Sequence, residues 1–121
     1  MYTYQQSTGR FFDADGHLLE VGYSGNGKGL NNPLLQAVAM HGPVPQGDYE
    51  IGTAFTDQKL GRLAMPLTPC GGQDMLGRSG FFIHGDNQEM NHSASEGCII
   101  LSHIARVAIA ASGDRKLRVV A

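Results

Sequence analysis

Two residues suited to nucleophilic catalysis lie in the second half of this chain, each next to a short apolar run. His84 follows the run 81–83, and Cys98 precedes the run 99–101. Apolar runs of this length, bounded by glycine and polar residues, are typical of buried strands. Two such strands would present an imidazole and a thiol at the same rim, where the imidazole acts as base for a thiol nucleophile. The sequence therefore predicts a cysteine–histidine pair.

A structural role in the core is the alternative for Cys98, because free cysteine is among the most buried residue types. Its neighbours favour the catalytic interpretation. Gly97 leaves room for a substrate carbonyl near the backbone, and the N–H groups of Gly97 and Cys98 would serve as oxyanion donors. Ser95 and Glu96 add polar groups that a packed strand does not need. A protonated imidazole beside the thiol would lower its pKa from about 8.5 and favour the thiolate.

Four further residues are candidates for supporting roles. An imidazole base needs a third group to orient it, and both the Gly85 carbonyl and the Asp86 carboxylate follow His84 directly. A solvated turn position is the alternative role for Asp86. His92, in the polar loop before the cysteine, is either a competing base or a solvent-exposed residue. Arg78 has a guanidinium that can bind a substrate carboxylate bidentately, and a surface ion pair is its alternative.

A zinc site is the competing interpretation, since His84, Asp86, His92 and Cys98 are all possible ligands. The sequence has no His-Glu-x-x-His or Cys-x-x-Cys spacing, so we expect no metal and no other cofactor. The glycine-rich stretch 24–33 runs into Asn-Asn-Pro rather than a helix, which argues against a phosphate-binding loop. Cys70 lies in a Pro-Cys-Gly-Gly turn, and we expect no disulfide between it and Cys98.

The rest of the chain must supply the strands and turns that position these residues. Seventeen glycines and five prolines in 121 residues favour many short strands. Alternating apolar residues and turn signals predict strands over residues 2–6, 10–13, 17–23, 49–55, 60–67 and 116–120. The sequence indicates one mainly β domain, residues 1–121.

One helix is expected in the C-terminal half, over about residues 102–112. Ser102 is a suitable N-cap, and Gly113 stands where a left-handed residue commonly ends a helix. Between them one apolar face falls at helical spacing; its residues are Ile104, Val107, Ala108 and Ala111.

Charge and hydropathy exclude several classes of partner. A net charge of −2 gives no reason to expect nucleic acid or an anionic membrane. No apolar stretch approaches the roughly 20 residues of a membrane span. The first residues lack the charged head and apolar middle of a secretory signal peptide. For work outside the cytoplasm, we expect either a route other than an ordinary leader or a leader that this sequence lacks.

Nearly the whole chain resembles the small DUF2778-type branch of the L,D-transpeptidase (YkuD-like) family, which includes type VI secretion L,D-transpeptidase effectors. The segments that carry the resemblance are 6–9, 22–25, 31–33, 42–47, 77–86 and 95–100. The last two, at this spacing, are the specific ones. In the broader signature a histidine precedes a Ser/Thr-His-Gly-Cys segment. Here Glu96 replaces the second histidine, Ile100 replaces an asparagine, and the interval from His84 to Ser95 is shorter.

The resemblance implies a β-sandwich that carries a cysteine nucleophile and acts on the stem peptides of peptidoglycan. It implies Cys98 as nucleophile, His84 as general base and the Gly85 carbonyl as the group that orients the imidazole. Ser95 and Gly97 become pocket and oxyanion-side residues. The expected reaction is L,D-carboxypeptidase cleavage, D-amino-acid exchange, or both.

The resemblance also implies a setting for this reaction. It indicates an antibacterial effector, made in the bacterial cytoplasm and delivered into the periplasm of a neighbouring cell. The expected partners are an immunity protein and type VI secretion components. A zinc-dependent cell-wall peptidase and a non-catalytic peptidoglycan-binding module are the alternatives.

Overall fold

The structure, a computed structural model, describes all of residues 1–121 and is built mainly from short β-strands. The strands are β1 (Tyr2–Gln5), β2 (Arg10–Phe12), β3 (Leu18–Val21), β4 (Tyr23–Ser24), β5 (Gly47–Ile51), β6 (Phe55–Asp57), β7 (Gly61–Pro69), β8 (Phe81–His84), β9 (Ile99–Ile100) and β10 (Lys116–Val120). Two short 3-10 turns, η1 (Gly27–Gly29) and η2 (Pro33–Leu35), and one helix, α1 (His103–Ser112), complete the chain. The mainly β class with one helix in the C-terminal half is confirmed.

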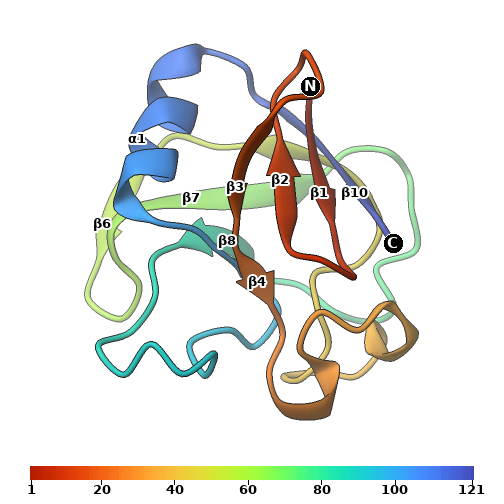
Figure 1. Cartoon of the computed structure of the whole chain (residues 1–121). Helices are drawn as coiled ribbons and strands as arrows, with labels where there is room; N and C mark the ends of the chain where they lie inside the picture. Colours follow the sequence, from red (N-terminus) through yellow and green to blue (C-terminus); the bar gives the residue numbers. More distant parts are fainter.

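The strands form one continuous sheet that curls into a nearly closed barrel (Figure 1). Their order is β3-β2-β1-β10-β5-β7-β8-β9-β4, with β6 paired to β7 outside this path. The two edge strands, β3 and β4, are separated in sequence by Gly22 alone, so the chain itself joins the two ends of the sheet. The single strand predicted over residues 17–23 is therefore two strands, because the chain passes at Gly22 from one sheet edge to the other.

Gly22 occupies a position where no side chain fits. Its N–H donates to the Gly9 carbonyl at 2.7 Å. A Cβ on Gly22 would lie 2.0 Å from the Ile100 carbonyl oxygen, and a Cβ on Gly9 would lie 2.0 Å from the Gly22 oxygen. The ends of the sheet thus approach each other backbone to backbone, and glycine at both positions permits the closure.

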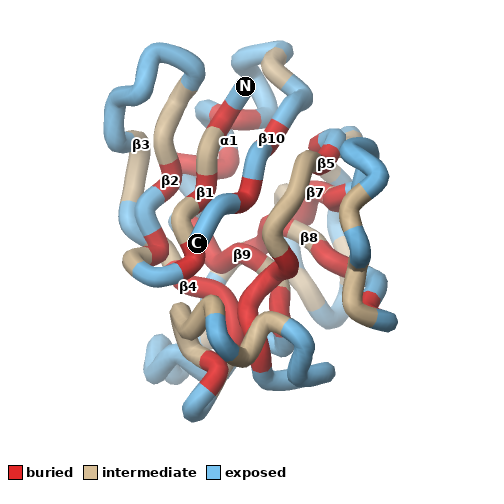
Figure 2. Tube along the Cα trace, turned by 90° about the vertical axis from the view of Figure 1, so that its right-hand side faces the viewer, coloured by how far each residue is buried: buried red, intermediate tan, exposed pale blue.

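Large apolar side chains from several strands fill the barrel. The largest fully buried ones are Tyr4, Tyr49, Phe11, Met65 and Ile83, from β1, β5, β2, β7 and β8. Figure 2 shows the buried segments gathered at the centre of the molecule, with exposed loops around them. Each such side chain contributes roughly 1.5–3 kcal/mol of burial free energy, so β8 and β9 lie against a rigid interior.

The helix begins and ends as the sequence predicts. The Ser102 hydroxyl accepts the Ala105 N–H, and Gly113 has a φ of 76° in the left-handed region. These signals are local, since each depends on a few neighbouring residues. The helix is neither long nor apolar enough to cross a membrane.

The apolar face that the sequence pattern indicates is not the face that this helix buries. The side chain of Ile104 is 82% exposed and that of Val107 is 44% exposed. The helix instead buries Ala105 and Ile109, together with the charged residue Arg106. The helix carries two apolar stripes, and packing against the barrel selects the one beside the arginine. A hydrophobic pattern alone does not distinguish the two stripes.

We predict that Gly22→Ala destabilises the protein strongly, because its Cβ would meet the Ile100 carbonyl at the closure of the sheet. The free energy of unfolding should fall by about 3 kcal/mol or more. Gly16→Ala is the control: that turn glycine has a φ of +82° but no atom within 4 Å of a Cβ, so only backbone strain of about 1 kcal/mol applies. Urea unfolding of both variants measures the difference. Equal losses would contradict the closure argument.

Candidate active site

A cavity of about 610 Å³ contains both residues of the predicted pair, Cys98 and His84. Its walls come from four parts of the chain, namely Ala39 and Met40, then Asp57, Lys59 and Leu60, then residues 77–82 with His84, and finally Ser93, Ala94, Glu96 and Cys98. The structure therefore brings the thiol, the imidazole and Arg78 to one hollow. Other predicted site residues, Gly85, Asp86, His92, Ser95 and Gly97, do not line it.

The pairing of β8 with β9 places the thiol and the imidazole together. The two strands are parallel, with Ile83 opposite Ile99 and His84 opposite Ile100. Cys98 directly precedes Ile99, so the same register continued by one residue sets it beside Phe82. Alternate residues of a strand point to the same face, and Cys98 therefore shares a face with His84. Ile83 and Ile99 point the other way and are fully buried in the core.

The His84 imidazole is held by the carbonyl of the next residue. Its Nδ1 lies 2.8 Å from the Gly85 oxygen. A carbonyl oxygen only accepts hydrogen bonds, so Nδ1 carries the proton and Nε2 of the neutral ring has a free lone pair. The side chain is almost wholly buried, with 5% exposure. The Gly85 carbonyl thus occupies the orienting position that the sequence had left open between Gly85 and Asp86.

Arg106 on α1 supports this arrangement from behind. A Cβ on Gly85 would lie 2.6 Å from Nη2 of Arg106, so the guanidinium occupies the space that a side chain at position 85 would need. Arg106 also donates from Nε to the Leu101 carbonyl and from Nη1 to the Arg62 carbonyl. The buried charge that the helix pattern did not predict therefore packs beneath the residue that orients the base.

Cys98 ends an irregular turn, residues 95–98, in which every carbonyl accepts a hydrogen bond from a side chain. The donors are Asn26 Nδ2 to Ser95 at 2.8 Å, Arg78 Nη2 to Glu96 at 2.9 Å, Ser24 Oγ to Gly97 at 2.9 Å, and Ser95 Oγ to Cys98 at 2.5 Å. We call this segment the nucleophile turn. A hydrogen bond to a backbone carbonyl fixes the plane of its peptide. The four side chains therefore set the direction of the cysteine N–H and Cβ.

One of the two expected oxyanion donors is already used. The Gly97 N–H donates to the Ser95 hydroxyl at 3.1 Å, whereas the Cys98 N–H has no acceptor within the chain. Gly97 itself is buried at a φ of +137°, and a Cβ there would lie 2.6 Å from Nη2 of Arg78 and 2.7 Å from the Phe81 ring. Glycine is thus required at this position for packing, and of the two expected donors only the Cys98 N–H is free.

Arg78 holds backbone carbonyls instead of pairing with a surface acid. Nη1 donates to the Gln36 and Pro43 carbonyls at 2.7 and 2.8 Å, and Nη2 donates to Gly42 at 3.1 Å and to Glu96 at 2.9 Å. The side chain is 9% exposed, and its guanidinium lies 5.1 Å from the centre of the Phe81 ring. Four of its five N–H donors are therefore occupied. The expected grip on a substrate carboxylate does not fit this arrangement, which makes Arg78 a positioning residue.

The thiol and the imidazole are both held in their neutral forms. Burial raises the pKa of the Cys98 thiol, and the Phe82 backbone amide offsets this only in part. Burial also lowers the pKa of His84, against the opposing effect of its bond to the Gly85 carbonyl. The expected lowering of the thiol pKa is therefore wrong for the resting site, because desolvation disfavours both charged forms. A neutral imidazole bonded through Nδ1 keeps the lone pair of Nε2 free to accept a proton.

Asp86 and His92 contact Tyr23 on β4 rather than the catalytic pair. The Tyr23 hydroxyl donates to Oδ1 of Asp86 at 2.7 Å. The exposed His92 ring packs edge-on against the Tyr23 ring with centroids 4.9 Å apart. Both residues therefore hold the loop between β8 and the nucleophile turn. The four proposed zinc ligands do not gather as a group of potential metal-binding atoms.

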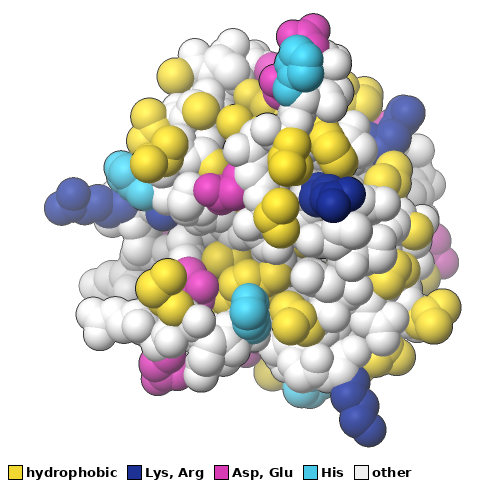
Figure 3. Space-filling model, in the orientation of Figure 1, with side chains coloured by type: hydrophobic (Ala, Val, Ile, Leu, Met, Phe, Trp, Pro, Cys, Tyr) yellow, Lys and Arg dark blue, Asp and Glu magenta, His cyan; other side chains and the backbone are white.

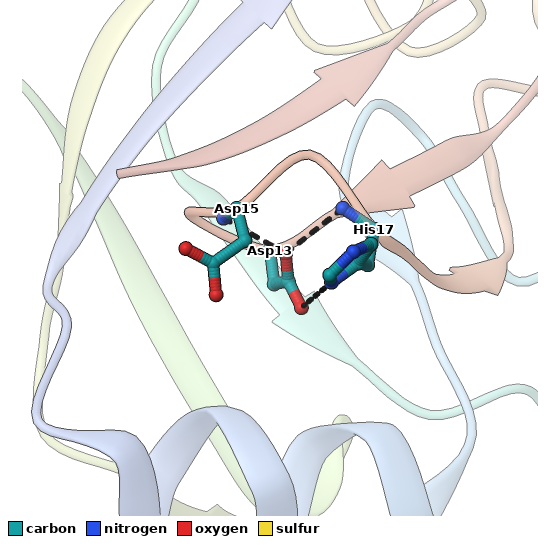
Figure 4. A group of neighbouring side chains, drawn as sticks. All are labelled: Asp13, Asp15 and His17. Carbon is teal, nitrogen blue, oxygen red and sulfur yellow. Dashed lines mark hydrogen bonds and ion pairs between the residues drawn. The ribbon is translucent and has the colours of Figure 1, made fainter.

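A different group of potential metal ligands lies in the turn between β2 and β3, shown in Figure 4. Oδ1 of Asp13 accepts the N–H groups of Asp15 and His17, each at 2.9 Å. The His17 ring lies 3.8 Å from the other oxygen of Asp13. These are the contacts of an aspartate-stabilised turn, and they account for the grouping without an ion.

Sequence reasoning missed three residues of this region. Ser24 and Asn26 hold the nucleophile turn, and Lys59 lies on the cavity wall. Ser24 falls within the segment 22–25 that carried part of the resemblance, which was its only signal. Cys70 is exposed, and neither Cys70 nor Cys98 is in a disulfide.

The fold and the cavity define a small β-barrel-like domain with a cysteine and a histidine at one site. Comparison with known families matches residues 19–121 to the Tlde1 domain. The chain belongs to the Tlde1 domain family, a family of type VI secretion effector domains. A search of curated proteins found no match.

We predict that Cys98, which is half-buried, reacts as a neutral thiol. In a Cys70→Ala background, the rate of alkylation by iodoacetamide should rise with pH and reach half its maximum above about pH 8.5, because burial raises the thiol pKa. Mass spectrometry of the modified protein gives the rate at each pH. A reaction already at its plateau below about pH 7 would instead indicate a thiolate–imidazolium pair.

Arg78→Ala should destabilise the protein, because four carbonyls lose their charged donor. The expected loss is about 3 kcal/mol or more in the free energy of unfolding. Arg78→Lys should recover little, since a single ammonium cannot reproduce the planar fork. Arg10→Ala, at an exposed residue, is the matched control and should change stability by less than about 0.5 kcal/mol. An equal free energy of unfolding for Arg78→Ala and Arg10→Ala, measured in urea, would refute the positioning role.

Proposed function

We propose that this domain is a cysteine acyl-transfer enzyme that acts on the stem peptides of peptidoglycan. Its reaction is L,D-carboxypeptidase cleavage of tetrapeptide stems, exchange of their terminal D-amino acid, or both. The observation that carries the proposal is the placement of Cys98 and His84 on one cavity wall, with Nδ1 of the imidazole bonded to the Gly85 carbonyl. The family membership supports delivery as an effector, and the resemblance supplies the substrate class.

Acylation begins from the neutral pair. Nε2 of His84 takes the thiol proton as Sγ of Cys98 attacks the carbonyl of the diamino-acid residue. The oxyanion that forms receives the Cys98 N–H, the donor left unused in the nucleophile turn. The imidazolium then gives its proton to the departing amine. Free D-alanine leaves, and a thioester joins the stem peptide to Cys98.

The second half of the reaction decides the product. Water, deprotonated by Nε2 of His84, attacks the thioester and releases a tripeptide and the free thiol. The amine of another D-amino acid, attacking in the same way, yields an exchanged tetrapeptide. Both routes use the same base and the same oxyanion donor, so one site carries both activities.

This activity fits a domain that enters the periplasm of a neighbouring cell, where stem peptides are exposed. Removing or exchanging the terminal D-alanine alters the peptides that cross-linking enzymes use. A producing cell would then need an immunity protein against the domain, and type VI secretion components would carry it. The cavity of about 610 Å³ is large enough for a peptide end.

We predict that purified protein releases D-alanine from a disaccharide-tetrapeptide and that the release depends on the two cavity residues. Cys98→Ala should abolish it, and His84→Ala should lower the rate by roughly 10²–10⁴-fold. His92→Ala and Cys70→Ala are matched controls that should retain the rate, because neither residue lines the cavity. Mass spectrometry of the muropeptides detects the products.

The same assay separates the alternatives. Activity that survives in Cys98→Ala and disappears with a chelator would indicate a zinc peptidase. Muropeptide binding that persists in Cys98→Ala, with no product from the wild type, would indicate a binding module. A loss in His92→Ala with full activity in His84→Ala would reverse the assignment of the base.

A further inference from the structure

The proposed substrate ends in carboxylates, and the cavity must offer a cation to hold one. Only two lysine or arginine side chains line the cavity, Arg78 and Lys59. On the face of the molecule in Figure 3, lysine and arginine side chains lie at a few separate places and form no broad cationic surface that could bind a carboxylate. The choice is therefore between these two residues.

The guanidinium of Arg78 is already bonded to backbone carbonyls. Four of its N–H donors bond to the carbonyls of three separate stretches, at residue 36, residues 42–43 and residue 96. Turning the guanidinium toward a substrate would leave these buried acceptors unpaired, at a large cost in stability. Arg78 is thus excluded as the carboxylate contact by the bonds that make it a positioning residue.

Lys59, unlike Arg78, has a charged group that the fold leaves free. It lies at the tip of the hairpin between β6 and β7, and Oδ2 of Asp57 holds this tip by accepting the N–H groups of Lys59 and Leu60 at 2.8 and 2.9 Å. The backbone of the lysine is therefore fixed. Its side chain is exposed, and its ammonium forms none of the hydrogen bonds or ion pairs within the chain.

The charge of Lys59 also reaches the nucleophile. It acts to lower the pKa of the Cys98 thiol, opposing Glu96, which raises it. Lys59 and Cys98 also line the same cavity, so one substrate can contact both. Residues 57–60 form one wall of the cavity and the nucleophile turn forms another, so a peptide lying between them meets the lysine and the cysteine together.

We propose that Lys59 binds a carboxylate of the stem peptide and so sets the specificity of the site for peptide ends. The carboxylate is that of the terminal D-amino acid or that of the diamino-acid side chain, which share the same chemistry. This inference rests on the proposed acyl transfer for the identity of the substrate. Lys59 is a specificity residue: it holds the substrate, while His84 and Cys98 carry out the bond changes.

The test compares three disaccharide-tetrapeptides: the free acid, its terminal carboxamide, and the carboxamide of the diamino-acid side chain. For the free acid, Lys59→Ala should raise KM about five- to tenfold, with kcat changed less than about twofold, because an exposed ion contact is moderately strong. One of the two carboxamides should show no effect of Lys59→Ala, and that carboxamide identifies the carboxylate that the lysine binds. Lys59→Arg should restore KM.

Lys28→Ala is the matched control, since that exposed lysine lies in η1 and does not line the cavity. It should leave KM unchanged for all three substrates. An unchanged KM in Lys59→Ala would overturn the proposal, as would an equal rise for the acid and both carboxamides.

Equilibrium binding separates this proposal from the proposed reaction. Calorimetric titration of the free acid into Cys98→Ala, and into the same protein with Lys59→Ala, measures the contact without turnover. Weaker binding by the double variant supports the lysine contact even if the wild type releases no D-alanine, an outcome that would reject the acyl transfer alone. Equal binding by the two proteins, or no binding by either, overturns the lysine contact.

Discussion

The site depends on the hydrogen bonds that side chains make to the carbonyls of the nucleophile turn, residues 95–98. An irregular turn cannot satisfy its buried carbonyls through a strand ladder, and leaving them unpaired would cost about 1–3 kcal/mol each. Ser24, Asn26, Arg78 and Ser95 supply the donors. The same bonds fix the peptide planes before Cys98, and so they determine where its thiol and N–H point. Stability and catalytic geometry therefore share one set of contacts.

Closure of the sheet brings two of those donors to the turn. Gly22 joins β3 to β4 across the two edges of the sheet, and β4 then pairs with β9, with Ser24 opposite Ile99. Ser24 consequently lies close enough to bond the Gly97 carbonyl. Without a glycine at position 22 the chain could not pass the Ile100 carbonyl, and the donors would be carried away from the nucleophile. Closure of the barrel and placement of the donors at the turn before Cys98 thus depend on the same glycine.

The sequence predicted features that depend on neighbours along the chain and missed those that depend on neighbours in space. Ser102 and Gly113 bound the helix as expected, because caps depend on a few adjacent residues. The buried side of the helix differs from the apolar face in the pattern, because packing against the barrel selects the face with Ala105 and Ile109. The pair Cys98 and His84 could be predicted from two apolar runs. The role of Arg78 could not, since its acceptors lie far away in sequence.

Desolvation explains why the thiol of Cys98 and the imidazole of His84 are neutral in the resting site. A thiolate beside an imidazolium would place two charges where burial disfavours both. Keeping both groups neutral avoids that cost, and Nε2 of His84 remains available to take the thiol proton during attack. In the proposed reaction, charge would appear only on the oxyanion and the ring, where the Cys98 N–H and the Gly85 carbonyl are placed to stabilise it. The proposed general-base mechanism therefore fits a neutral pair in this cavity better than a permanent ion pair.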